Sequence, residues 1–132
     1  MLLPIVLSLA LAATAELEPS RGFCAFPATP SGGGMLQMSL QPGADRALSR
    51  SRQVWLELGG AQRLRARMRR AEPGEPAELV IRTEDLGGEL TLSLRADGRA
   101  LLRLLPEGRT AAIEREGRCG GVASLRALLA RR

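Results

Sequence analysis

The sequence predicts a mainly β protein, an antiparallel meander or small open barrel of about seven strands followed by a C-terminal α-helix. Apolar and polar residues alternate with a period of two through most of residues 35–115, as they do in half-buried strands. After residue 121 the period becomes helical, and one face collects the apolar residues Val122, Leu125, Leu128 and Leu129. Short connections rich in Gly and Pro separate the strands, which favours antiparallel neighbours.

The first fifteen residues of the 132-residue chain predict an export signal. The apolar stretch Leu2–Ala12 is too short to span a bilayer, and it leads into the small-residue triplet Ala13–Ala15, which is typical of a cleavage site. The alternative is a buried N-terminal helix of the folded protein. We expect a mature chain that starts at Glu16, is periplasmic or secreted, and has no stable membrane insertion after the signal is removed.

Residues 16–34 predict an irregular segment at the start of the mature chain. Three prolines and the run Gly32–Gly34 interrupt any period there. Residues 35–132 are expected to form a single β-rich domain with the C-terminal helix. The mature length of 132 − 15, or about 117, residues is that of one domain.

The first predicted strand begins near Met35, where Leu36, Met38 and Leu40 alternate with polar residues. Burial then decides the register of the first hairpin. A three-residue loop over Gly59–Ala61 pairs apolar residues across the two strands, whereas a two-residue loop would place arginine on the apolar face. The later strands are predicted around Val54–Leu58, Leu64–Met68, Leu79–Thr83, Leu90–Leu94, Leu102–Leu104 and Thr110–Arg115.

The dipeptide Asp97-Gly98 is a strong signal for a second hairpin. A three-residue loop, Ala96–Gly98, aligns Leu92 with Leu102 and puts Gly98 at the left-handed position of a bulged turn. A two-residue loop would instead oppose Leu92 to Arg103. Burial again favours the three-residue loop.

Two cysteines in an exported chain predict one disulfide, Cys24–Cys119. Such a bridge would tie the start of the mature chain to its end. The alternatives are a reactive thiol or a bridge between two molecules. Neither cysteine has a second cysteine at the spacing of a redox motif, so redox catalysis has no support in the sequence.

The composition excludes several kinds of chemistry. All 19 basic residues are arginine, and the chain contains no Lys, His, Tyr or Asn. Catalytic triads with histidine, Schiff bases and ordinary zinc sites are therefore excluded. Acid–base work would fall to carboxylates, and we expect no catalytic residue, no metal and no cofactor. The carboxylate groups considered are Glu84-Asp85, Glu72 with Glu75 and Glu78, and Glu114 with Glu116.

The strongest candidate for binding is a row of arginines, Arg63, Arg65, Arg67 and Arg69, on one face of a predicted strand. Alternate residues of a strand lie about 6–7 Å apart, and guanidinium groups bind phosphate and carboxylate in a bidentate manner. The predicted register also sets Trp55 opposite Arg65, which favours a cation–π contact. The alternative interpretation is ordinary solvated surface, because arginine is the only basic residue type in this chain.

We expect an exported, non-enzymatic binding module that uses the arginine strand face for an anionic envelope component or an acidic protein. Nucleic acid is not expected, because export removes the usual target. One alternative is a small lipocalin-like carrier that holds an apolar ligand among leucines of a barrel interior. Another is a periplasmic enzyme inhibitor, to which the architecture is similar at the level of fold alone.

Overall fold

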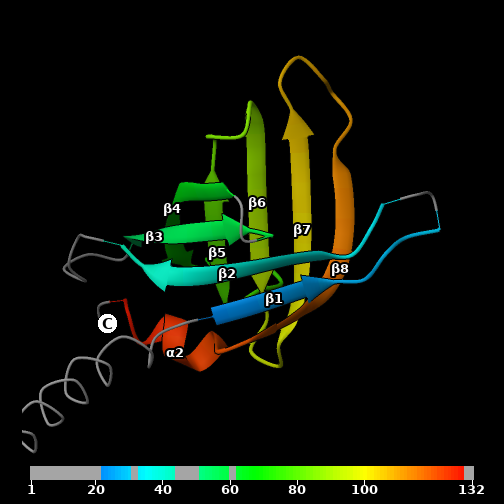
Figure 1. Ribbon diagram of the computed structural model, residues 1–132. Coiled ribbons are helices and arrows are strands. Elements are labelled where there is room, and N and C mark those ends of the chain that lie inside the picture. The colour runs from blue at the N-terminus through cyan, green and yellow to red at the C-terminus, as the bar shows by residue number, and fades with distance from the viewer. Residues whose placement is uncertain (1–21, 31–32, 44–50, 60–61, 130–132) are drawn as a thin grey trace, which may run out of the picture.

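The computed structural model describes residues 22–30, 33–43, 51–59 and 62–129, and these fold into eight antiparallel strands and one short helix (Figure 1). The predicted export signal lies outside the described residues. Each strand pairs with the next and β8 pairs with β1, so the sheet closes into a barrel. The mainly β prediction is confirmed. The elements are β1 (Gly22–Phe26), β2 (Leu36–Pro42), β3 (Ser51–Leu58), β4 (Gln62–Arg70), β5 (Leu79–Thr83), β6 (Gly88–Leu94), β7 (Arg99–Pro106), β8 (Ile113–Gly120) and α2 (Val122–Arg126).

Both predicted hairpin registers are confirmed. Leu56 lies opposite Leu64 across β3 and β4, and Leu92 lies opposite Leu102 across β6 and β7. Gly98 has φ of 96°, the left-handed conformation that the bulged turn requires. The registers follow from burial, because the alternative pairings would place arginine inside the barrel.

One apolar cluster fills the barrel interior. Every strand contributes side chains to it, and each fully buried leucine, isoleucine, methionine or phenylalanine contributes about 1.5–3 kcal/mol to stability. The core therefore supplies the rigid frame on which the outward-facing side chains are held. The largest fully buried side chains are those of Phe26, Met38, Leu40, Leu56, Met68, Leu79, Ile81, Leu92, Leu94 and Leu125.

Helix α2 covers the end of the barrel at which β1 begins (Figure 1). The Leu125 side chain is fully buried and packs against Gly22, where a Cβ would lie 2.5 Å from one leucine methyl carbon. Arg52 Nη1 donates a 3.4 Å hydrogen bond to the Leu128 carbonyl oxygen. The helix is shorter than its apolar pattern predicts, since it ends at Arg126. Leu128 and Leu129 lie beyond that end and are nevertheless buried. No helix in the described ranges is both long and apolar enough to cross a bilayer.

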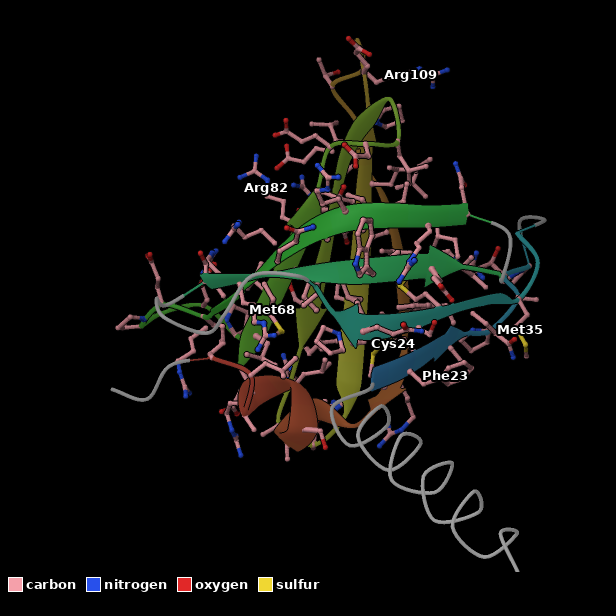
Figure 2. All side chains as sticks on the ribbon, turned by 60° about the vertical axis from the view of Figure 1, so that its left-hand side comes forward. Phe23, Cys24, Met35, Met68, Arg82 and Arg109 are labelled. Carbon is pink, nitrogen blue, oxygen red and sulfur yellow. A yellow bond between two sulfur atoms is a disulfide. The ribbon has the colours of Figure 1, made fainter. Side chains whose placement is uncertain are left out.

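The predicted disulfide is confirmed, and it joins the first strand to the last. Cys24 in β1 and Cys119 in β8 lie directly opposite each other and are bonded through their sulfur atoms. Figure 2 labels Cys24 on β1. The bridge therefore fastens the seam at which the sheet closes on itself.

The prediction of an irregular segment over residues 16–34 was wrong for Gly22–Phe26, which form β1. This strand raises the count from about seven to eight and supplies the partner that closes the barrel. The apolar–polar alternation is hidden there because the outward-facing Phe23 is apolar and 51% exposed. Only Gly22, Cys24 and Phe26 are buried.

The last strand also differs from its prediction. It runs from Ile113 to Gly120 rather than from Thr110 to Arg115. Gly117, which the sequence suggests as a strand end, lies inside β8 opposite Ala100. A Cβ at this position would lie 2.5 Å from Cδ2 of Phe26, so the glycine makes room for the buried ring rather than for a turn.

Candidate functional site

The four predicted arginines, Arg63, Arg65, Arg67 and Arg69, all lie on the outer face of β4. Arg63, Arg65 and Arg67 are exposed and Arg69 is half-buried, whereas the alternate residues Leu64, Ala66 and Met68 are buried. The strand therefore separates charge from core as its sequence predicts, because successive side chains point to opposite faces of a sheet.

Two hydrogen bonds hold the backbone of Arg65 to the end of β5. The buried Thr83 hydroxyl donates to the Arg65 carbonyl oxygen at 2.7 Å, and Asp85 Oδ2 accepts from the Arg65 N–H at 3.4 Å. The Thr83 oxygen also accepts the Asp85 N–H at 3.2 Å. This network fixes where β4 presents the Arg65 side chain.

Trp55 lies beneath two guanidinium groups. The Cζ atom of Arg63 is 4.5 Å from the centre of the Trp55 ring, and that of Arg65 is 5.6 Å from it. The predicted contact with Arg65 is confirmed, and the contact with Arg63 is additional. Glu57 pairs with Arg63 at 3.6 Å, as its cross-strand position predicts. The indole therefore supports the arginines, and its face is engaged by cations from the same chain.

Strand β5 adds a fifth arginine to this surface. Arg82 lies directly opposite Arg67 in the ladder, and Figure 2 shows Arg82 projecting from the outside of the barrel. Like charges directly across a ladder repel each other. The repulsion is reduced because Glu89 Oε2 lies 2.5 Å from Arg82 Nη2 and Glu84 Oε2 lies 3.6 Å from it.

These side chains surround an open hollow of about 550 Å³ on the outer face of β3, β4 and β5. We call this hollow the arginine groove. Its lining carries four guanidinium groups and one carboxylate, together with hydroxyl and amide groups that can donate and accept hydrogen bonds. The lining residues are Ser51, Gln53, Arg65, Ala66, Arg67, Arg69, Val80, Arg82, Thr83 and Glu84.

The arginines of the groove differ in how they are compensated. Glu75 holds Arg69 through two contacts, Nη1–Oε1 at 3.0 Å and Nη2–Oε2 at 3.1 Å. Arg67 Nη1 donates to the Ser51 hydroxyl at 3.1 Å. The Arg65 guanidinium makes no ion pair with any residue that the structure describes. Among the groove arginines, Arg65 therefore differs from Arg69 and Arg82, whose charges described carboxylates pair.

Arg69 also shifts the ionisation of Glu75. The hydrogen bond from the Arg69 side chain, followed by the one from the Glu72 N–H at 2.6 Å, lowers the pKa of Glu75 from 4.5 to about 2. The same contact raises the pKa of Arg69. Glu75 thus stays ionised through nearly the whole acid range.

This shift predicts how pH affects the contact. The folded-state pKa of Glu75 is below its unfolded value, so the contribution of Glu75 to the stability of the folded state is complete above about pH 4.5. It is lost as the pH falls through about 2. We expect NMR titration of the Glu75 carboxyl carbon to give a midpoint near 2, and Glu75→Gln to weaken the pH dependence of stability between these values. A midpoint near 4.5 would show that the ion pair does not form in solution.

None of the carboxylates considered for acid–base chemistry is buried. Glu114 and Glu116 are exposed on the outer face of β8, and Glu114 pairs with Arg103 at 3.3 Å. Besides Glu75, Asp97 has a shifted pKa, which backbone and side-chain hydrogen bonds from Arg99 lower. Such shifts keep a carboxyl ionised, whereas a general acid needs a raised pKa. Within the described ranges, no three acidic or cysteine side chains gather as a possible metal site.

The leucines at which the carrier alternative expects a cavity are packed together. Leu56, Leu64, Leu92 and Leu102 belong to the single core cluster, and none is more than 6% exposed. None of these four leucines lines the arginine groove or either of two further hollows on the described part of the chain.

Comparison with known protein families, with curated proteins and with solved structures finds no match to this chain.

Proposed function

We propose that this protein is an exported, non-enzymatic binding module that uses the arginine groove to hold an anionic partner. The observation that carries the proposal is the gathering of Arg65, Arg67, Arg69 and Arg82 around one open hollow. The partner is an anionic envelope component or an acidic protein, and the place of action is the periplasm or the exterior of the cell.

The arrangement of charge supports an anion at this place. Arg67 and Arg82 lie opposite each other on neighbouring strands, and the Cα atoms of such a pair are about 4.5–5.5 Å apart. An anion between them adds to the compensation that Glu84 and Glu89 give Arg82 and accepts hydrogen bonds from both guanidinium groups. The contact with Trp55 restrains Arg65, which lowers the entropy lost when this side chain meets a ligand.

The packed interior makes the carrier alternative less favourable. An apolar ligand among the core leucines would have to displace side chains that already fill the barrel, and overpacking a filled core destabilises it. The outer face needs no such rearrangement, because the arginine groove is already open. We therefore place the binding surface outside the barrel.

Charge reversal in the groove tests the proposal. We expect Arg65→Glu combined with Arg67→Glu to lower the affinity for anionic probes about tenfold or more, because two attractive contacts become repulsive. Suitable probes are lipopolysaccharide and polyglutamate at low ionic strength, where screening is weakest. Trp55 is the only tryptophan of the chain and contacts Arg65 of the groove, so its fluorescence can follow binding.

The matched control is Arg109→Glu combined with Arg118→Glu. It changes the net charge by the same amount but alters two exposed arginines outside the groove. Arg109 lies in the connection between β7 and β8 (Figure 2). The control should retain most of the affinity. If both double variants lose affinity equally, or if neither does, the arginine groove is not the binding site.

A further inference from the structure

A second hollow, of about 240 Å³, lies on the outer face of β5 to β8 beside the arginine groove. We call it the Val80 hollow. Val80 lines both hollows, and it is only 5% exposed although its side chain is on the outer face. The Val80 hollow is lined by Glu75, Pro76, Ala77, Val80, Ser93, Arg95, Arg99, Ala100, Leu101, Glu116 and Gly117.

One residue of the connection between β4 and β5 links the two hollows through an ion pair. Residues 71–78 fold back over the barrel surface, with the Ala71 N–H donating to the Glu78 carbonyl oxygen at 2.9 Å. Glu75 lines the Val80 hollow, and Arg69, which it holds in a bidentate contact, lines the arginine groove. One ion pair therefore stands at the boundary between a cationic surface and a partly apolar one.

The connection contributes consecutive residues to both surfaces. The Glu75 carboxylate binds a guanidinium of the groove, and the next two residues, Pro76 and Ala77, line the Val80 hollow. The rest of that hollow is partly apolar because it includes Val80 and the half-buried Leu101. A cavity of about 150 Å³ can hold a benzene molecule, so the Val80 hollow has room for an apolar side chain.

We propose that the partner of the arginine groove is a polypeptide segment in which an acidic residue is followed by an apolar one. Its carboxylate binds Arg69 in place of Glu75, and its apolar side chain enters the Val80 hollow. This inference rests on the proposed function and names the class of partner.

Three further arguments favour a peptide over a phosphate. Carboxylates of the same chain already bind Arg63, Arg69 and Arg82, so arginines of this surface can pair with the carboxylates of a peptide. The apolar part of the Val80 hollow offers nothing to an inorganic anion. In addition, alternate side chains of an extended peptide repeat every 6–7 Å or so, as the arginines of β4 do.

The experiment uses the mature protein and a synthetic peptide with the sequence of residues 71–78, in which three glutamates include Glu75. Glu75→Gln removes the internal competitor and is expected to raise the affinity for this peptide about two- to fivefold, the range of an exposed ion pair. A peptide with glutamine in place of each glutamate should show no such gain. The matched control is Glu114→Gln, which also removes an exposed carboxylate paired with an arginine, and it should leave the affinity unchanged.

Leu101→Ser tests the apolar part of the site. It should weaken peptide binding about threefold or more, because a partly buried apolar contact is lost, and it should leave the binding of inorganic phosphate unchanged. Equal gains for Glu75→Gln and Glu114→Gln, or a Leu101→Ser variant that binds the peptide normally, would overturn the inference.

The outcomes separate this inference from the proposed function. If phosphate binds in a way that requires Arg65 and Arg67 but the peptide gains nothing from Glu75→Gln, the groove binds anions and the peptide assignment is wrong. If neither probe depends on Arg65 and Arg67, the proposed function itself is wrong, and the inference that rests on it fails as well.

Discussion

Replacement of Cys24 by Ser is expected to lower the free energy of unfolding by about 2–5 kcal/mol. The disulfide closes a loop with a sequence separation of 95 residues, for which loop entropy alone predicts about 4–5 kcal/mol. The seam that it fastens is also short. β1 and β8 pair at only three positions, Phe23, Cys24 and Ala25 in β1, whereas β3 and β4 pair at eight.

Denaturant unfolding followed by Trp55 fluorescence measures this effect. Cys24→Ser combined with Cys119→Ser should give the same loss without leaving a free thiol, and a reducing agent should not destabilise it further. Ala25→Ser is the control on the same strand, and its half-buried site should make its effect much smaller. A Cys24→Ser variant with an unchanged midpoint would show that the bridge contributes nothing to stability.

The registers could be predicted because burial leaves one choice. At the turn after β3, a slip of one residue would place Arg63 inside the barrel where Leu64 now lies. The cost of burying an unpaired guanidinium is far greater than any local turn preference. The disulfide was predicted from the presence of two cysteines in an exported chain. Their direct opposition in β1 and β8 could not be predicted, because it depends on barrel closure, which no local pattern encodes.

The sequence could not reveal β1 for a physical reason. Periodicity detects a strand when its outward residues are polar, but Phe23 faces outward and Gly22 faces inward. The pattern is thus inverted at two of five positions. Gly22 is required by the fully buried Leu125 of α2, a residue about a hundred positions away, so the constraint is tertiary.

The candidate site was predicted in part. Alternation on β4 identified Arg63 to Arg69, and the hairpin register identified the contact of Trp55 with Arg65. The position of Glu75 could not be predicted, because the eight residues 71–78 can leave the sheet in many directions. Their path is held by the Arg69 contact together with backbone hydrogen bonds such as that from the Glu78 N–H to the Leu94 carbonyl oxygen, and these depend on the folded geometry.

The second large effect is expected at Gly117, where substitution by alanine should destabilise the protein by about 1–3 kcal/mol. A Cβ there would collide with the Ala25 carbonyl oxygen and lie 2.5 Å from Phe26 Cδ2. The Phe26 ring is fully buried in the core, so it cannot move aside without disturbing its neighbours. The carbonyl oxygen belongs to β1, whose backbone is held by pairing with both β2 and β8.

Gly120→Ala is the matched control, since it changes the same residue type in the same strand. A Cβ at Gly120 meets no atom within 4 Å, and Gly120 is not among the described glycines with positive φ. Alanine there should be neutral or slightly stabilising, because it restricts the unfolded chain. Thermal unfolding of the two variants would therefore give midpoint shifts of different size and sign.

Phe26→Leu should reduce the free-energy cost of Gly117→Ala, because a smaller side chain leaves space for the new methyl group. Equal shifts at Gly117 and Gly120, or no effect of Phe26→Leu on that cost, would show that the ring does not require the glycine.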